Sequence, residues 1–265
     1  QTVLPPDLDG DNAIVFPAIH GTFGEDGTLQ GLLDESGVEY AGSDADSSRL
    51  CMDKHRAKNR VWEAGVQVAP GRFFREPQEI SVDEMIANLG PELVVKPTDQ
   101  GSSVELSIVR GEEELASLLS ELPKGNWLIE KRILGRELTV GVLRGDSLGV
   151  VEVIPHGGVY DYERKYQSGQ TEYRYPAVLP CDVEEEVKSD ARTAFEVCGC
   201  RDFARVDFIV CEDGHSYFLE VNTLPGLTET SLLPMSASCS GYDFNRLAQE
   251  LVEPALDRFR LCRAS

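Results

Sequence analysis

Short apolar runs alternate with amphipathic stretches from the beginning of the chain. Residues 13–19 predict a buried strand, residues 27–36 a helix, and residues 38–42 a second short strand and turn. A strand, loop, helix and strand in this order are typical of a parallel α/β unit. We therefore expect the first part of the chain to contribute to such a unit.

The middle of the chain has the pattern of a small unit of its own. It predicts a helix over 47–64, strands over 72–74, 93–97, 104–109 and 127–131, and helices over 82–89 and 112–121. Gly65 directly follows the first of these helices, where glycine is a common C-terminal stop. Helices and strands in this arrangement indicate α+β organisation.

The strands become longer in the last half of the chain. The pattern predicts strands over 137–142 and 148–154, a helix over 183–198, a hairpin over 204–221 and a closing helix over 242–260. The interval 160–171 is polar and rich in Tyr and Lys. An irregular segment of this length is a candidate flexible lid.

The hairpin carries the most informative polar residues. Alternate residues of a strand share a face, so Glu220 and Asn222 point the same way, and the partner strand can bring Asp207 beside them. Two carboxylates and an amide oxygen suit Mg²⁺ held jointly with a phosphate. Arg205 shares a face with Asp207 and would meet the phosphate charge. The alternative is a solvated polar face, but the rigid Pro225-Gly226 corner favours a built site.

A glycine-serine loop follows the strand at 93–97. Gly101, Ser102 and Ser103 offer backbone N–H groups and hydroxyls in a tight loop, which suits phosphate oxygens. Taken alone, such a loop is usually an ordinary turn. Lys96 changes this interpretation, because an ammonium group at the end of a buried strand needs a partner and a phosphate is a natural one.

Composition and charge narrow the class of partner. The 265 residues are 41% hydrophobic and 27% charged, as in an ordinary soluble globular protein. The net charge of −21 argues against nucleic acid. No apolar run approaches a membrane span, no signal-peptide pattern occurs at the N-terminus, and the seven cysteines are scattered, so we predict a cytoplasmic protein with reduced thiols.

This set of residues resembles the ATP-grasp enzymes, and motifs along the chain are similar to those of the D-alanine–D-alanine ligase family. The motifs are His20-Gly21, residues 24–31, Met52-Asp53-Lys54, Val95-Lys96-Pro97, residues 101–104, Ile129-Glu130-Lys131, residues 160–166, residues 220–226 and Ser231-Leu232. They occur in the family's order from about residue 15 to the closing helix. Several motifs in register are far more specific than any one of them.

The resemblance implies an α/β and α+β chain with the ATP-grasp fold. Residues 1–45 would be the remainder of an N-terminal substrate-binding α/β domain, 46–133 a small central α+β domain, and 134–265 a larger mixed-sheet domain with the metal site. The family's first strand and Gly-Gly loop, whose glutamate binds the first D-alanine, have no match here, and Glu105 stands where the family usually has glycine. A carboxylate near the phosphate loop would be unfavourable unless it points outward, and strand alternation after Val104 permits an outward Glu105.

The resemblance also assigns the cofactors. Asp207, Glu220 and Asn222 would hold two Mg²⁺ ions, with Mn²⁺ as an alternative. Glu130 would take the adenine amino group, the backbone at Ile133 would also read the base, and Glu137 would hold the ribose. The remaining ATP-binding residues would be Lys54, Lys96, Ser103, Lys131 and Lys165.

In this family ATP phosphorylates one D-alanine, and the amine of a second attacks the acyl phosphate. The implied catalytic residues are Ser102, Tyr166, Arg205 and Gly226, of which Arg205 and the Gly226 N–H would stabilise the oxyanion. The implied substrate-binding residues are His20, Ser231 and Leu232. Tyr166 favours a dipeptide product, because ester-forming members carry histidine there.

The resemblance thus implies an ATP-dependent ligase that makes D-alanyl-D-alanine for peptidoglycan synthesis, usually as a homodimer. Two alternatives stay open. One is a non-catalytic ATP-binding homologue, and the other is an ATP-grasp ligase for another amino or hydroxy acid.

Overall fold

A computed structural model describes residues 8, 10, 12–100, 105–155 and 171–264. In this part of the chain the strands form three sheets. The first is a parallel pair, β1 (Ile14–Val15) and β2 (Glu39–Tyr40), with α1 (Thr22–Glu25) and α2 (Thr28–Glu35) between the two strands. The predicted α/β start is therefore confirmed, although the strand expected over 13–19 is shorter.

Two helices, not one, lead into the second sheet. The helix predicted over 47–64 is wrong in one respect: α3 (Ala45–Met52) ends and α4 (Lys54–Glu63) begins at Asp53. The Asp53 carboxylate accepts hydrogen bonds from the backbone N–H groups of His55 and Arg56, both at 3.1 Å, and so caps α4. Lys54 is consequently the first residue of a helix and does not lie inside one.

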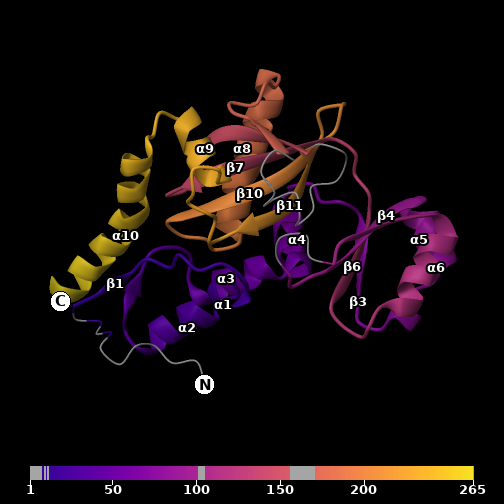
Figure 1. The fold of residues 1–265 in the computed structure, drawn as a ribbon, viewed down its shortest axis with the longest axis horizontal. Coiled ribbons are helices and arrows are strands. Elements are labelled where there is room, and N and C mark those ends of the chain that lie inside the picture. The colour runs from indigo at the N-terminus through magenta and orange to yellow at the C-terminus, as the bar shows by residue number, and fades with distance from the viewer. Residues whose placement is uncertain (1–7, 9, 11, 101–104, 156–170, 265) are drawn as a thin grey trace.

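The second sheet is antiparallel in the order β3-β6-β4-β5. Its elements are β3 (Gly71–Phe74), the short 3₁₀ helix η1 (Pro77–Glu79), α5 (Val82–Leu89), β4 (Glu92–Pro97), β5 (Ser107–Arg110), α6 (Gly111–Glu121) and β6 (Trp127–Lys131). Figure 1 shows this sheet with α5 and α6 at one end of the molecule. Glu105 is exposed in a turn with a φ of 57°, so the strand predicted from 104 begins later, although Glu105 does point to solvent.

The third and largest sheet has the order β11-β10-β7-β8-β9. Its strands are β7 (Arg136–Leu143), β8 (Asp146–Pro155), β9 (Thr171–Arg174), β10 (Phe203–Val210) and β11 (Ser216–Asn222), and its helices are α8 (Cys181–Val197), α9 (Leu232–Cys239) and α10 (Phe244–Ala264). The pattern did not predict α1 or α9, and it assigned the start of β9 to the lid. The predicted mixture of α/β and α+β organisation is confirmed, whereas the division at residues 45/46 and 133/134 stays a prediction.

The two faces of the large sheet are covered by different helices. One face joins the main core, in which Val140, Val206 and Phe208 pack with Val187 and Ala191 of α8. On the other face, Val151 and Val153 of β8 pack against Leu232 and Met235 of α9. Since side chains alternate along a strand, the polar residues of β10 are placed on the α9 face of the sheet.

Helix α10 joins the far end of the chain to the first sheet. Figure 1 shows it running along the side of the molecule toward β1. Arg258 donates to Glu39 at 2.7 Å, to both oxygens of Asp202 at 2.7 and 2.9 Å, and to the Tyr40 carbonyl at 2.8 Å. Among the described residues, no helix is both long enough and apolar enough to span a membrane.

Candidate active site

Hairpin β10–β11 has the register that the predicted metal site requires. Asp207 lies directly opposite Glu220, and Arg205 lies opposite Asn222. Directly opposed residues of an antiparallel pair project from the same face, so these four side chains share one side of the hairpin. The pairing shifts by one residue just after Asp207, where a bulge interrupts the ladder. The predicted convergence of Asp207 with Glu220 and Asn222 is therefore present in the backbone register.

The oxygen atoms at this place are held by specific donors. Asp207 accepts two hydrogen bonds from Arg205, Nε at 2.9 Å and Nη2 at 2.7 Å, and one from the Thr139 hydroxyl. Asn222 Oδ1 accepts the Leu224 N–H at 2.9 Å and thereby orients the chain into the Pro225-Gly226 corner. Arg205 is thus engaged with a carboxylate, in addition to the phosphate role that the sequence predicts for it.

Lys54 reaches this hairpin from the start of α4. Its Nζ lies 3.1 Å from Oε2 of Glu220 and donates to the Gln100 carbonyl at 2.7 Å. The Asp53 cap fixes the helix end from which Lys54 projects. A residue of the predicted phosphate set and a residue of the predicted metal set are therefore in contact.

A buried charge cluster of Lys58, Glu130 and Lys96 lies next to Lys54. Lys58 pairs with Oε1 of Glu130, and Lys96 Nζ lies 2.7 Å from Oε2 of the same carboxylate. The three side chains are at most 10% exposed. Sequence reasoning identified Lys96 and Glu130 but missed Lys58. Its spacing from Lys54 was a usable signal, because residues four apart lie on the same face of a helix.

The pKa values of this cluster follow from burial and from the charges around it. Burial lowers the pKa of Lys58 to about 8, with the charges of Lys96 and Lys54 adding to the shift and Glu130 opposing it. Burial alone would raise the pKa of Glu130, but the charges and hydrogen bonds of Lys58 and Lys96 outweigh it and hold that pKa at about 2. Two ammonium groups and one carboxylate leave the cluster with one net positive charge below pH 8.

The Pro225-Gly226 corner meets the predicted substrate residues. A side-chain carbon at Gly226 would lie 2.7 Å from Ser231 Oγ and 3.9 Å from the His20 ring, so a larger residue would displace the Ser231 hydroxyl. Ser231 Oγ accepts the Thr228 N–H at 2.9 Å and stands at the start of α9, directly before Leu232. His20 is exposed, with Nδ1 3.7 Å from Glu25. The structure therefore brings His20, Gly226 and Ser231 together.

The predicted adenine and ribose residues lie toward the other end of the hairpin. Glu137 of β7 pairs with Ile209 of β10, whereas Thr139 pairs with Asp207. Lys131 ends β6 and is exposed, and Ile133 follows it in a half-buried position. Along β10 from its C-terminal end, the predicted nucleotide-binding residues therefore come first, then the predicted metal ligands, and then the predicted substrate-binding corner. The predicted residues Ser102, Ser103, Lys165 and Tyr166 lie outside the described residues.

The oxygen donors on the hairpin are few for a metal site made of protein ligands alone. Over the described parts of the chain, no group of three or more His, Cys, Asp and Glu side chains is arranged to hold a metal. Asp207 and Glu220 are only two carboxylates, with the Asn222 amide as the third oxygen donor. Mg²⁺ usually keeps several waters and binds through one or two carboxylates together with substrate phosphates. A site with few protein oxygens and room for phosphate and water therefore suits Mg²⁺.

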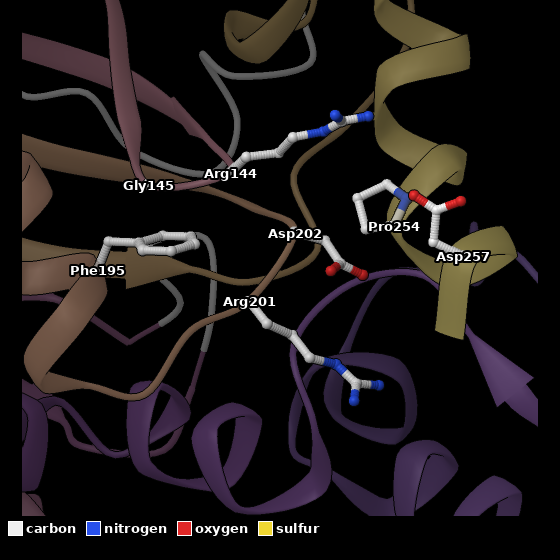
Figure 2. Close-up of a pocket in the computed structure, with 7 residues that line it drawn as sticks. All are labelled: Arg144, Gly145, Phe195, Arg201, Asp202, Pro254 and Asp257. Atoms are coloured by element: carbon white, nitrogen blue, oxygen red, sulfur yellow. The ribbon is translucent and has the colours of Figure 1, made fainter. Parts of the chain in front are cut away.

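A cavity of about 350 Å³ lies elsewhere, between the β7–β8 turn, α8 and α10. Figure 2 shows Phe195 on one side of it and Pro254 and Asp257 on the other. None of its lining residues belongs to the predicted site, so the candidate active site is the polar face of the hairpin and not this cavity.

A small antiparallel sheet stands beside a larger one, and Lys54 at the start of α4 pairs with Glu220 on a hairpin of the larger sheet. This is the architecture of an ATP-grasp enzyme, as in the solved structures of similar chains. The family description "D-ala D-ala ligase C-terminus" matches residues 62–253, and "D-ala D-ala ligase N-terminus" matches residues 4–43. The chain belongs to the D-alanine–D-alanine ligase family. The expectation of an ATP-dependent ligase with the ATP-grasp fold is confirmed.

Individual relatives are similar to this chain over most of their length. The D-alanine–D-alanine ligase of Syntrophotalea carbinolica is 43% identical over 246 residues, which cover 91% of this chain and 78% of that protein. The crystal structure of the Bacillus anthracis ligase complexed with ATP is 34% identical with a TM-score of 0.81, covering 96% of this chain and 82% of that one. The VanG D-Ala:D-Ser ligase of Enterococcus faecalis is also 34% identical, with a TM-score of 0.82, covering 91% and 72%.

Proposed function

We propose that the protein uses ATP to join two D-alanine molecules into D-alanyl-D-alanine through an acyl phosphate, for peptidoglycan precursor synthesis. The observation that carries this proposal is the register of hairpin β10–β11, which sets Asp207 opposite Glu220 and Arg205 opposite Asn222. Lys54 approaches this face from α4, and the proposed substrate corner at Gly226 adjoins it. Family membership supports the same reaction.

Asp207, Glu220 and Asn222 are the proposed ligands of Mg²⁺, as two ions with Mn²⁺ as an alternative. The bound cation would neutralise phosphate charge, which is most of what phosphoryl transfer asks of a protein. Lys54 and Lys96 would bind phosphate oxygens, and Lys131 would contact the nucleotide beside Ile133 and Glu137. Ser103 and Lys165 belong to the same proposed set.

Glu130 receives a modified role in this proposal. Both of its carboxylate oxygens already bind lysines, so it serves as the counter-charge that sets the position of Lys96. A carboxylate oxygen has two lone pairs, so a contact with the adenine amino group is compatible with these bonds. We propose both functions for this residue.

The acyl-transfer step would use the residues around the corner. The Asp207 carboxylate fixes the Arg205 guanidinium in place, and the Gly226 backbone N–H supplies a second donor for the developing oxyanion. Ser231 and Leu232 begin α9 and would bind one substrate carboxylate, with His20 beside the other. Ser102 and Tyr166 complete the proposed catalytic set.

The decisive experiment measures phosphate release that depends on both D-alanine and Mg-ATP. Mass spectrometry of a mixture of D-alanine, D-serine and D-lactate then identifies the product, and we expect mainly D-alanyl-D-alanine. A predominant serine product would favour the activity named for the Enterococcus relative. A folded protein that binds ATP without releasing phosphate would instead be the non-catalytic homologue.

The metal assignment has its own test, the substitution Glu220→Gln. We expect it to weaken Mg²⁺-dependent nucleotide binding by about 2 kcal/mol, as for one lost charged contact. Glu212→Gln removes the same charge from the exposed turn of the same hairpin and is the matched control. Nucleotide affinity that is indifferent to Mg²⁺ and to Glu220→Gln would remove the basis of the site.

We also propose that the active protein is a cytoplasmic homodimer, on the resemblance to the family alone. Light scattering of the purified chain at working concentration measures the mass directly, and a monomer would contradict this part of the proposal.

A further inference from the structure

Three buried thiols meet on the α8 side of the large sheet, away from the proposed ligase site. Cys51 lies near the end of α3, and Cys198 and Cys200 flank Gly199 just after α8. The Sγ atoms of Cys51 and Cys200 are 3.7 Å apart. All three residues belong to the main hydrophobic core. Sequence reasoning treated these cysteines as scattered, because positions 149 residues apart give no sign of contact.

Two of the thiols, Cys51 and Cys198, differ in pKa. Hydrogen bonds to Cys198 and Cys200 raise the pKa of Cys51, and burial raises it further. The hydrogen bond with Cys51 lowers the pKa of Cys198 and the Arg60 charge adds to this, while burial opposes both. Thiols that hydrogen-bond to one another and titrate differently are placed for thiol chemistry.

One member of the cluster is reachable from outside. A cavity of about 490 Å³ is lined by Gly199 and Cys200 together with Arg192 and Thr193 of α8. Neither Cys51 nor Cys198 lines it. It shares Gly145 and Phe195 with the cavity in Figure 2, so the two adjoin. A small solute in this cavity therefore meets Cys200, whose sulfur lies 3.7 Å from that of Cys51.

We propose that Cys51 and Cys200 form a redox modification site, in which a small hydroperoxide entering the cavity oxidises Cys200 and Cys51 then closes a disulfide with it. The site is distinct from the ligase machinery, and the cross-link itself does not depend on the proposed function. Only the effect on activity rests on that function.

The chemistry balances with hydrogen peroxide as the oxidant. The Cys200 sulfur attacks a peroxide oxygen, so an S–O bond forms, the O–O bond breaks and water leaves. The Cys51 sulfur then attacks the Cys200 sulfur, so the S–S bond forms and the S–O bond breaks. The Cys51 proton departs with the hydroxide as a second water. Two thiols are oxidised and one peroxide is reduced.

Closing this disulfide would affect the proposed ligase site through the two chain segments that carry Cys51 and Cys200. The two sulfur atoms must approach from 3.7 Å to about 2.05 Å. Cys51 lies two residues before Asp53, which caps the helix that begins with Lys54. Cys200 lies shortly before β10, which carries Arg205 and Asp207. The contraction therefore displaces Lys54 relative to the hairpin.

The test uses the full chain, hydrogen peroxide and mass spectrometry after trypsin digestion under non-reducing conditions. Trypsin releases residues 50–54 with Cys51 alone and residues 193–201 with both Cys198 and Cys200. We expect these two peptides to be linked, with the link kept in Cys198→Ser and lost in Cys51→Ser and Cys200→Ser. We expect D-alanine-dependent phosphate release to fall on the order of a hundredfold, the effect of misplacing a reacting group by about 1 Å, and to recover with dithiothreitol.

Matched variants make the result decisive. Cys181→Ser removes an exposed thiol at the start of α8 and should respond to peroxide as the unmodified chain does. No link between the two peptides, or a link that persists in Cys200→Ser, would overturn the pairing. If peroxide inactivates the Cys51→Ser variant as strongly as the unmodified chain, the disulfide is not the cause of the lost activity. If the chain shows no ligase activity, the link alone decides the proposal.

Discussion

At the scale of single residues, the site depends on charges that compensate one another before any nucleotide arrives. Lys54 contacts Glu220, and Lys58 and Lys96 share Glu130. The sequence predicted most of these side chains, since a lysine or glutamate at a strand end stands out against apolar neighbours. It could not predict their pairing or the part played by Lys58, because partners across three elements are decided by packing and not by spacing.

The first prediction concerns Lys58, whose removal changes the net charge of the buried cluster from +1 to 0. Lys58→Met should raise the KM for ATP about tenfold, equivalent to about 1.4 kcal/mol, and change kcat less, because binding of phosphate loses a positive charge. Lys188→Met, which removes a surface lysine paired with Glu184, is the control. An unchanged KM in a folded Lys58→Met variant would contradict the charge argument.

Acid stability provides a second prediction. The pKa of Glu130 is lowered to about 2 in the folded chain from 4.5, so the unfolded chain binds more protons between these values. The free energy of unfolding should therefore fall as pH drops from 4.5 to 2, by on the order of 3 kcal/mol. Denaturant titrations at several pH values measure this loss.

The variant Glu130→Gln should be less stable at neutral pH but should lose less stability across the same acid range. Lys58 does not contribute to this acid-range loss, because its pKa is lowered from 10.5 to about 8. Its titration changes the free energy of unfolding only between about pH 8 and 10.5, where stability should rise with pH. Parallel acid profiles for the variant and the unmodified chain would assign the loss to other groups.

At the scale of elements, the break between α3 and α4 is the feature that the pattern obscured. No glycine or proline interrupts residues 47–64, so hydrophobic periodicity predicted one helix. The structure begins a new helix because Asp53 caps it, and this turns Lys54 toward the hairpin. Helix α9 escaped prediction for another reason: its buried residues surround the helix and give little periodicity.

Asp53 is therefore predicted to act on both stability and nucleotide binding. Asp53→Ala should cost about 1 kcal/mol of unfolding free energy, the usual loss of an N-cap, and should also raise the KM for ATP by loosening Lys54. Asp53→Asn keeps a capping oxygen and should retain most of both properties. Thermal unfolding measures the stability of the two variants, and initial-rate kinetics measure their KM for ATP. Equal values for the Ala and Asn variants would contradict the capping role of Asp53.

At the scale of the whole molecule, the three sheets are joined by contacts that no local pattern reveals. The order of elements predicted the strand content and the hairpin well, because each depends on neighbouring residues. The contact of α10 with the first sheet was not predictable, since Glu39, Asp202 and Arg258 are brought together only by the complete fold.

Arg258 is predicted to be the principal link between these parts. Arg258→Ala leaves the buried Asp202 without its bidentate partner, so the unfolding free energy should fall by about 3 kcal/mol, the low end for a broken buried pair because Arg258 is 28% exposed. Arg258→Lys should recover only part of the loss, since one ammonium cannot replace the fork. Arg260→Ala, at an exposed position on the same helix, is the control. Equal stability of the two alanine variants would contradict the prediction.

The Arg258 contact also determines when the first sheet can be completed during synthesis of the chain. Glu39 and its partner are separated by 219 positions, so a ribosome that adds about 5–20 residues per second needs roughly 10–45 s between them. During that interval β1 and β2 have emerged without the helix that anchors them, and strands of two residues cannot hold themselves together. We therefore expect β1 and β2 to acquire their final structure only after α10 is made, although they emerge long before it.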